Sequence, residues 1–432
     1  MTSRQEAPDI LILSSLNPIE RNGKLISPKL NDRVLEYEPF VPYMWSEFLE
    51  TETGSLEAES KARKLSEFYL LKIALQLQNM PVDTELLIER FNQASIELYG
   101  RTDPVEAASI ANTELIELNN NLTDDSVIAI YKKIANNKNE KNESLDSSVF
   151  DELRSAFFEK FSGIVDIIQR LPDGPYSPEA IRKIFEDILG DLSIKEKSWL
   201  EWNITNSLDN TMLNVVPEMK EIDVPDGRQD VEDKRKLLGL VFHEIIIHAQ
   251  RAVNGYELND ELMYRGLPTY LDFEEGLGVM SEYLVTGVIP DKIRDRYIDI
   301  ALATGVVDGF LLGRQELIEF GIKREKARAL TRGKTLNIED THKMVNDHVN
   351  RIFRGGTGEA IRDENGKIVL QAVFTKDIVY YTGFISARNY IKHQLLLGTP
   401  SNKLINFLLS GKFDPTNSSH LEYLKNKHSI KL

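Results

Sequence analysis

The sequence predicts a mostly helical α+β protein, in which a small sheet lies next to one long helix with an unusual set of polar residues. Two observations indicate this class. Apolar residues recur at helical spacing through most of the chain, and short alternating segments occur between residues 199 and 216. We expect an irregular N-terminal extension over 1–36, a helical subdomain over 37–198 and a further region over 199–432, or 37–432 as one compact unit.

The first helices are indicated by apolar spacing and by residues that favour helix ends. Apolar residues recur at helical spacing over 56–80, and a second such run over 83–100 ends at a glycine. Proline suits the first helical position, so further helices are expected to begin at Asp103-Pro104 and at Ser177-Pro178. With another apolar run over 157–171, this half of the chain is predicted to be helical.

The pattern then changes from helical to strand-like. Residues 199–204 alternate between apolar and polar side chains, and 212–216 is a second short apolar run, so both are predicted to be strands. Val224-Pro225-Asp226-Gly227 has the composition of a turn. After it, a helix is predicted from about Val231 to Val253, with Asn254-Gly255 at its end. The remaining chain is expected to be mostly helical.

The composition excludes several classes of function. The 52 Lys and Arg residues against 68 Asp and Glu residues leave a net charge of −16. Nucleic acids and anionic membranes are therefore not expected as main partners, because binding them needs a basic face. The chain has no cysteine, so a transition metal would be held by histidine and carboxylate. The first residues contain no apolar run long enough for a signal peptide or a membrane span, so we expect a cytoplasmic protein.

One predicted helix carries ionisable residues among apolar ones. The segment KLLGLVFHEIIIHAQRAVNG places His243, Glu244 and His248 among Leu, Val, Phe and Ile. An unpaired glutamate in such surroundings is costly or becomes neutral. A divalent cation would satisfy both imidazoles and keep the carboxylate ionised. The alternative is a pair of core histidines bound to backbone, with Glu244 in an ion pair with Arg251 or Arg265.

The spacing of the two histidines predicts a distortion of this helix. They are five residues apart, whereas the familiar helical zinc motif spaces its histidines four apart. In a regular α-helix five residues rotate the second side chain by about 140° from the first. One wide turn of π type, with roughly 4.4 residues, reduces this angle to about 50°. We therefore predict a π-type distortion between His243 and His248.

A third ligand is available further along the chain. Catalytic zinc usually has three protein ligands and one open position. In TYLDFEEGLGVMSEYL, Glu274 and Glu275 begin an apolar helix, and Gly276 and Gly278 let another backbone come close. With two histidines and one glutamate as ligands, Glu244 remains to take a proton from the attacking water and pass it to the leaving amine.

Four motifs carry a family resemblance: H-E-x-x-x-H at 243–248, E-E-G-L-G at 274–278, RIFRGG at 351–356 and FTKDIVYYTGF at 374–384. Together they resemble the tyrosine carboxypeptidase-like metallopeptidases, a family that includes the microtubule-associated tyrosine carboxypeptidase and the bacterial flavohemoglobin expression-modulating QEGLA-motif proteins. The resemblance covers roughly residues 60–430. It implies a helical, zincin-like peptidase with His243, His248 and Glu275 as zinc ligands and Glu244 as the general base.

The chain departs from the family pattern at two places. Ile245-Ile246-Ile247 stands where relatives often carry smaller residues, and Gly278 replaces the usual alanine of the QEGLA motif. Neither change removes a ligand. The three isoleucines are expected to narrow the pocket and so to affect the choice of substrate.

A carboxypeptidase also has to hold a free α-carboxylate, for which a guanidinium is well suited. The candidates in the family-like segments are Arg351, Arg354 and Lys376. Ordinary salt bridging is the alternative role for both arginines. Tyr380 or Tyr381 would orient the substrate or stabilise the oxyanion.

The sequence thus predicts a zinc metallopeptidase with 199–432 as its catalytic region, most simply a carboxypeptidase that removes a tyrosine-like residue from the C-terminal tail of a peptide or protein. The strand ending near Val216 would bind the substrate by edge pairing. The alternatives are an aminopeptidase, endopeptidase or amidase with the same zinc, a metal-binding regulatory protein without turnover, or a scaffold without metal. The basic run at 323–334 is either a docking site for an acidic tail or, more commonly, a solvated helix face.

Overall fold

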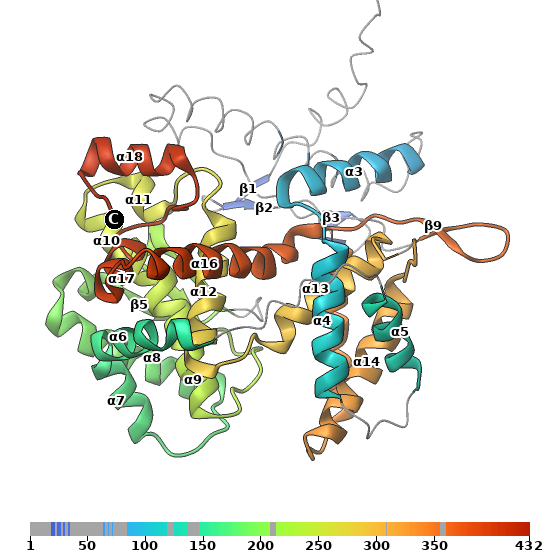
Figure 1. Ribbon diagram of the computed structural model, residues 1–432, viewed down its shortest axis with the longest axis horizontal. Coiled ribbons are helices and arrows are strands. Elements are labelled where there is room, and N and C mark those ends of the chain that lie inside the picture. Colours follow the sequence, from blue (N-terminus) through green and yellow to red (C-terminus); the bar gives the residue numbers. More distant parts are fainter. Residues whose placement is uncertain are drawn as a thin grey trace, which may run out of the picture. The chain divides into compact units, whose positions relative to one another are not determined.

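The computed structural model describes most of the chain from residue 84 onwards (Figure 1). The described ranges are 84–118, 125–136, 147–207, 213–307, 309–354 and 360–432, together with Lys64, Phe68, Leu71 and four short strands before residue 35. Apart from those three residues, which are helical, the helix predicted over 56–80 lies outside the described residues.

The described strands of the N-terminal segment form two antiparallel pairs. They are β1 (Ile19–Arg21) with β2 (Lys24–Ile26), and β3 (Lys29–Leu30) with β4 (Arg33–Val34). The irregular extension predicted over residues 1–36 did not include these pairs. Strands of two or three residues are too short to produce a steady apolar period, so the sequence pattern did not indicate them.

Contacts between residues divide the chain into two units that alternate along the sequence. The first unit consists of residues 1–41, 61–141 and 296–378, and the second of 42–60, 142–295 and 379–432. The boundary expected between residues 198 and 199 falls inside the second unit. Segments far apart in the sequence belong to the same unit, and local sequence patterns do not indicate which segments these are.

Besides the two N-terminal strand pairs, the described part of the first unit contains helices and a hairpin. Its helical segments are α3 (Thr84–Tyr99), α4 (Pro104–Glu117), α5 (Asp125–Ala135), most of α13 (Asp291–Thr304), α14 (Arg314–Thr331), α15 (Ile338–Ile352) and the 3₁₀ helix η7 (Thr375–Ile378). The hairpin pairs β8 (Ile361–Arg362) with β9 (Ile368–Leu370). The predicted helix start at Asp103-Pro104 is confirmed, since the Asp103 carboxylate accepts hydrogen bonds from the backbone N–H groups of Val105 and Glu106.

Buried ion pairs fix the charged residues in the core of the first unit. Arg324 donates two hydrogen bonds to Asp299, at 2.8 and 2.9 Å, and the His348 ring lies 2.8 Å from the same carboxylate. Burial by itself raises the pKa of Asp299, but Arg324 and His348 outweigh it and lower the pKa to about 2. Arg328 forms a similar pair with the buried Glu114. Two arginines of the basic run are therefore core residues and not part of a solvated or docking face.

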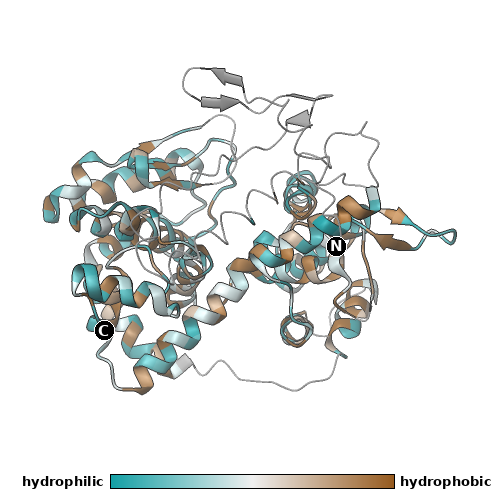
Figure 2. Cartoon of the chain, turned by 90° about the horizontal axis from the view of Figure 1, so that it is seen from above, coloured by the Kyte–Doolittle hydropathy of each residue, from teal (hydrophilic) through white to brown (hydrophobic). Residues whose placement is uncertain are grey.

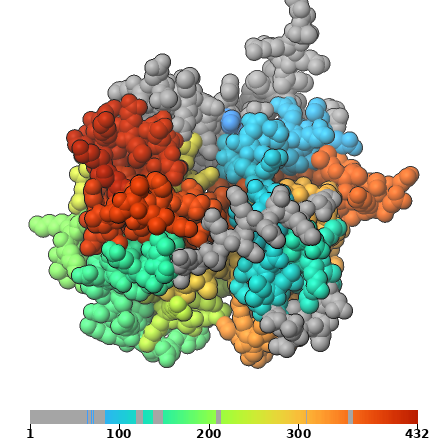
Figure 3. Space-filling view, in the orientation of Figure 1, coloured from blue at the N-terminus to red at the C-terminus, as the bar shows by residue number. Residues whose placement is uncertain are grey.

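The second unit combines helices with a small sheet. Its segments in chain order are η3 (Ser147–Phe150), α6 (Asp151–Lys160), α7 (Ser162–Arg170), α8 (Pro178–Lys195), η4 (Lys197–Glu201), β5 (Asn203–Thr205), β6 (Asn214–Val216), η5 (Pro217–Met219), β7 (Glu221–Asp223), α9 (Lys234–Val241), η6 (Phe242–Ala249), α10 (Gln250–Glu257), α11 (Glu261–Arg265), α12 (Leu271–Thr286), α16 (Val379–Leu396), α17 (Ser401–Leu408) and α18 (Ser418–His428). Early and late segments, coloured green and red in Figure 3, lie side by side, and α17 contacts α6.

The sheet of this unit is three-stranded, with β7 in the middle. β7 runs parallel to β5 and antiparallel to β6. The strand predicted over 212–216 is present as β6, and β7 was missed because Glu221–Asp223 is short and holds a single apolar residue. Together with the many helices, this sheet confirms the expected class, mostly helical with a small sheet.

The strand predicted to begin at Trp199 was wrong over its first residues. Residues Lys197–Glu201 form a 3₁₀ helix, and the strand begins only at Asn203. Trp199 and Trp202 are buried, whereas Leu200 is 66% exposed. The two buried side chains are three residues apart, which is the period of a 3₁₀ helix. Leu200 is apolar but exposed, and its position made the sequence resemble the alternation of a strand.

One continuous helical segment, α9 through η6 to α10, carries the unusual polar residues, but its end differs from the prediction. It begins after Asp233, whose carboxylate accepts a hydrogen bond from the Lys236 N–H at 2.8 Å. The end predicted at Asn254-Gly255 is wrong, since the helix continues to Glu257. A Cβ on Gly255 would lie 2.4 Å from the carbonyl carbon of Met263, so this glycine permits close packing on α11.

Two glycines let helices α12 and α16 cross closely. A Cβ on Gly276 would lie 1.9 Å from the Gly383 carbonyl carbon, and one on Gly383 would lie 1.9 Å from the Asp272 carbonyl oxygen. The prediction that Gly276 admits another backbone is confirmed. Gly278 instead faces a side chain, the His243 imidazole. The crossing fixes the position of α12 within the second unit.

Replacing Gly276 with alanine is expected to lower the free energy of unfolding by about 3 kcal/mol, because the added methyl group would meet backbone that has to move. Gly190→Ala in α8 is the matched control, since nothing lies within 4 Å of a Cβ at that position. The control is expected to stabilise by about 0.5–1 kcal/mol. Urea unfolding measures both changes, and equal effects of the two substitutions would contradict the close crossing.

Hydrophobic and hydrophilic residues alternate along the helices (Figure 2), the pattern of helices that pack one face on a core. Within the described ranges, no helix combines the length and the apolar composition that crossing a bilayer requires.

Candidate metal centre

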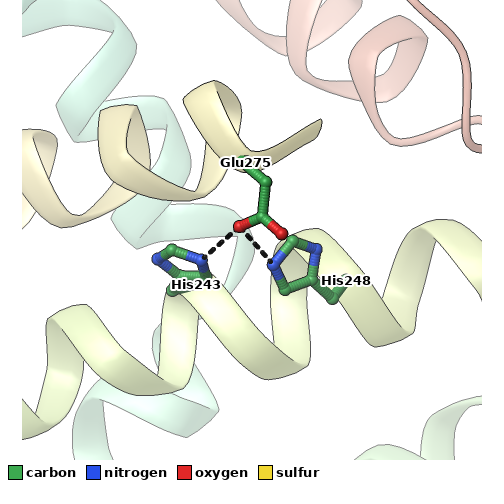
Figure 4. Close-up of side chains that lie close together, drawn as sticks. All are labelled: His243, His248 and Glu275. Atoms are coloured by element: carbon green, nitrogen blue, oxygen red, sulfur yellow. Dashed lines mark ion pairs between the residues drawn. The ribbon is translucent and has the colours of Figure 1, made fainter. Parts of the chain in front are cut away.

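The distortion predicted between His243 and His248 is confirmed. Residues Phe242–Ala249 form a π-helix, in which the backbone N–H of Gln250 donates to the carbonyl of Ile245, five residues earlier. The wide turn places both imidazoles on one side of the helix, with ring centroids 4.9 Å apart (Figure 4). The five-residue spacing is therefore compatible with a shared ligand.

Glu275, on α12, brings a third ligand atom to the two imidazoles. Its Oε2 lies 3.8 Å from His243 Nε2 and 3.7 Å from His248 Nε2 (Figure 4). One ligand atom of each residue lies within 4.8 Å of the others. A tetrahedral zinc site with bonds of about 2.0–2.2 Å separates its ligand atoms by roughly 3.4 Å. The three residues thus fit a zinc ion after a small inward movement.

Two further glutamates orient the imidazoles. His243 Nδ1 lies 2.6 Å from Glu282 Oε1, and His248 Nδ1 lies 3.0 Å from Glu274 Oε1. Each Nδ1–H can donate to its carboxylate, which leaves Nε2 unprotonated as the ligand atom on the side of Glu275. Carboxylate support of this kind is typical of histidines that bind a metal.

Glu274 is in turn held by two buried cations. Arg251 forms an ion pair with Glu274 and donates to the backbone carbonyls of Gly411 and Phe413, each at 2.7 Å. The Lys412 ammonium lies 3.4 Å from the same carboxylate. Arg251 is therefore not the partner of the general-base candidate, which was the alternative role considered for it.

Nearby cations favour the ionised form of the supporting carboxylates although both carboxylates are buried. Burial raises the pKa of Glu274 and of Glu282, but nearby cations outweigh it. Arg251 and Lys412 lower the pKa of Glu274 to about 2. Lys292 and His243 together lower the pKa of Glu282 to about 2.

In the candidate ligand residues, too, nearby charges outweigh the effect of burial on the pKa. Burial raises the pKa of Glu275, but His243 and His248 outweigh it and hold the pKa well below its usual range. Burial lowers the pKa of His243, but Glu275 and Glu282 outweigh it and raise the pKa to about 10. The carboxylates thus stabilise a positive charge beside the two imidazoles, and a bound divalent cation would supply that charge.

Glu244 follows the first histidine directly and is only half-buried. In the part of the chain that the structure describes, its carboxylate forms no hydrogen bond or ion pair. The alternative ion pair with Arg265 is not formed, because Arg265 pairs with Glu261 and Glu218. A carboxylate next to a metal centre with its oxygens available can act as a proton acceptor.

The three isoleucines between the histidines are buried. Ile245, Ile246 and Ile247 are at most 2% exposed, and Ile247 lines an apolar cavity together with Phe157 and Met280. The expected effect of these isoleucines on the choice of substrate stays a prediction.

Sequence reasoning missed the residues that support the histidines. Glu282 lies two helical turns after Glu275, on the same face of α12, and this spacing could have indicated it. Glu274 is buried beside the ligand candidates, with its Oε1 3.0 Å from His248 Nδ1. Lys412 lies more than one hundred residues away in the sequence, and no local signal indicates it.

Replacing Glu282 with glutamine is expected to weaken zinc binding about 10–100-fold, because the neutral amide no longer orients and polarises His243. Competition with a chromogenic chelator measures the affinity. Glu232→Gln, which removes an exposed carboxylate on the loop before α9, is the control and should not change it. Unchanged affinity in the Glu282 variant would show that this hydrogen bond does not support a metal ligand.

The predicted substrate-binding residues are divided between the two units. Arg351, Arg354 and Lys376 belong to the first unit, whereas the metal-ligand candidates belong to the second. Arg351 donates to Asp377 from two of its nitrogens, at 2.7 and 2.9 Å, and Arg354 lies 5.2 Å from the Phe374 ring centre. The salt-bridging alternative therefore describes Arg351. Tyr380 lies in the first turn of α16, half-buried.

In comparisons with known proteins, no family model, no curated protein and no solved structure matches the chain, so the resemblance to the tyrosine carboxypeptidase-like family stays a prediction.

Proposed function

We propose that the protein is a zinc-dependent peptidase that removes the C-terminal residue of a peptide or protein tail. The observation that carries the proposal is the convergence of His243, His248 and Glu275 on one point, next to Glu244, which follows His243 in the helix and whose charge acts on that imidazole. Two histidines and one glutamate are a ligand set of catalytic zinc in peptidases. The proposal includes a zincin-like arrangement, in which the ligand-bearing helix lies next to a small mixed sheet.

The residues of the site have separate roles in this reaction. A zinc ion held there would lower the pKa of a water molecule and polarise the scissile carbonyl. Glu244 takes the proton of the attacking water and transfers it to the leaving amine. Glu274 and Glu282 keep the imidazoles in the orientation in which Nε2 faces the ion.

The sheet supports a peptide as the substrate. β6 is an edge strand of the sheet and contacts η6, the π-helix with the ligand histidines. The outward backbone groups of an edge strand can pair with an extended chain, which is a common mode of peptide recognition. An extended substrate on β6 would thus lie along the helix that holds the metal ligands.

The test uses the zinc-loaded full-length protein and a peptide library in two forms, with free C-terminal carboxylates and with C-terminal amides. Mass spectrometry is expected to show loss of a single C-terminal residue from the free acids and no cleavage of the amides. Loss of N-terminal residues, internal cleavage or release of ammonia from the amides would instead identify an aminopeptidase, an endopeptidase or an amidase. Stoichiometric zinc without any hydrolysis would identify a metal-binding regulatory protein.

A further inference from the structure

Arg228 is a cation of the second unit that the mechanism above does not use. It follows β7 at the end of the turn Val224-Pro225-Asp226-Gly227. The turn is well fixed, because Arg182 donates to one of its backbone carbonyls at 2.9 Å and pairs with Asp226 at 2.6 Å. The backbone N–H of Arg228 donates to Pro225 at 3.2 Å. Arg228 is therefore placed by a rigid turn.

The charges of two carboxylates act on the guanidinium of Arg228, and within the described residues neither of them forms an ion pair with it. The carboxylates whose charges act on it are Glu244 and Glu282. In the described part of the chain its side chain forms no ion pair, and its buried Nε has no hydrogen-bond partner. A guanidinium stays protonated even when it is buried, so this arrangement leaves a charged donor group with unused hydrogen-bonding capacity.

The proposed reaction requires a cation at such a place. Glu244 has to reach the nitrogen of the leaving residue in order to protonate it. In a C-terminal residue, the α-carboxylate is separated from that nitrogen by the α-carbon alone. The group that binds the carboxylate must therefore lie close to Glu244, and Arg228 is a cation whose charge interacts with this glutamate.

We propose that Arg228 binds the terminal α-carboxylate of the substrate through its guanidinium and thereby restricts the site to free C-termini. The inference rests on the proposed function and gives it a substrate class. A planar guanidinium can donate two parallel hydrogen bonds to a carboxylate, which adds geometric selectivity to the charge attraction.

The other cations near the site are less suited to this role. Arg251 and Lys412 are buried and already pair with Glu274. Lys292 is exposed on α13 and interacts with Glu282. A solvated ammonium gives weaker and less directional recognition of a carboxylate than a guanidinium that is partly shielded from water.

The experiment measures binding, so that it does not depend on turnover. Zinc-loaded Glu244→Gln protein is titrated into a fluorescein-labelled peptide ending in Glu-Tyr, with a free carboxylate or with an amide, and anisotropy gives the two Kd values. We expect the acid to bind about 10–100-fold more tightly than the amide, as a charged hydrogen-bonded pair does. Adding the Arg228→Gln substitution should bring the ratio of the two Kd values close to one, because the acid binds more weakly. The Kd of the amide and the zinc content should stay unchanged.

Two further variants make the result specific. Arg170→Gln removes an exposed guanidinium at the end of α7 and should keep the acid-to-amide ratio, whereas Arg228→Lys keeps the charge without the planar fork and should reduce the ratio several-fold. The proposal is overturned if the Arg228→Gln variant keeps the full ratio, or if the Glu244→Gln protein itself does not distinguish acid from amide. Failure of the proposed function is a separate result: wild-type zinc protein that does not hydrolyse peptides, although acid binding still depends on Arg228.

Discussion

Glu244→Gln is expected to lower kcat for peptide hydrolysis by about 10³-fold or more while the protein keeps its stoichiometric zinc. Positioned general bases contribute about 10²–10⁴-fold, and here one carboxylate serves both the attacking water and the leaving amine. Glutamine has nearly the same shape and cannot accept a proton at neutral pH. Because the carboxylate of Glu244 is not a ligand and forms no hydrogen bond within the described residues, the metal centre should remain intact.

The measurement combines peptide hydrolysis with elemental analysis of the same preparations. Glu257→Gln is the matched control, since this exposed carboxylate lies at the end of the same continuous helix. Its activity should equal that of the wild type. If the Glu244 variant keeps wild-type kcat with zinc bound, the proton is taken by another group, and the assignment of Glu244 as the general base fails.

Glu275→Gln is expected to reduce zinc affinity by more than the roughly 10–100-fold assigned to loss of a supporting carboxylate. The substitution removes the anionic ligand that α12 contributes and leaves two imidazoles, which are too few to hold catalytic zinc firmly. The difference should appear in thermal unfolding. Zinc at about 1,000 times its Kd stabilises a protein by about 4 kcal/mol, so added zinc should raise the Tm of the wild type and not that of the variant.

The Glu282→Gln variant is the graded comparison for this experiment, since it keeps all three ligands. Its Tm should still rise on addition of zinc, at higher concentrations of the ion. Equal zinc-dependent stabilisation of the wild type and the Glu275 variant would show that the ion binds elsewhere, and the hydrolytic function would then lose its structural basis.

The clustering of His243, His248 and Glu275 could be predicted from the sequence because its main features are local. The five-residue spacing of the histidines, within an apolar segment, predicted the π-helix from helix geometry. Gly276 indicated a close backbone contact, which is found at Gly383. The choice of Glu275 over Glu274 needed the family resemblance, because adjacent residues on a helix differ by only about 100° and both face inward.

Other features depend on contacts between distant segments and could not be predicted. Arg351 lies in a segment that resembles the family, but its ion pair with Asp377 becomes visible only after folding. Lys412 reaches Glu274 from the C-terminal part of the chain, and β7 becomes a strand because neighbours on both sides pair with it. The cytoplasmic location and the lack of a nucleic-acid partner stay predictions from charge and composition.

The π-helix confines the additional residue between the histidines to one wide turn. Five residues at roughly 4.4 residues per turn rotate the helix by about 410°, and four residues of a regular α-helix rotate it by about 400°. Deleting Ile246 would therefore give the histidines the commoner four-residue spacing while Arg251 stays beside Glu274 and Gly255 keeps its contact with α11. A change between the two spacings thus requires no coordinated changes in the neighbouring helices.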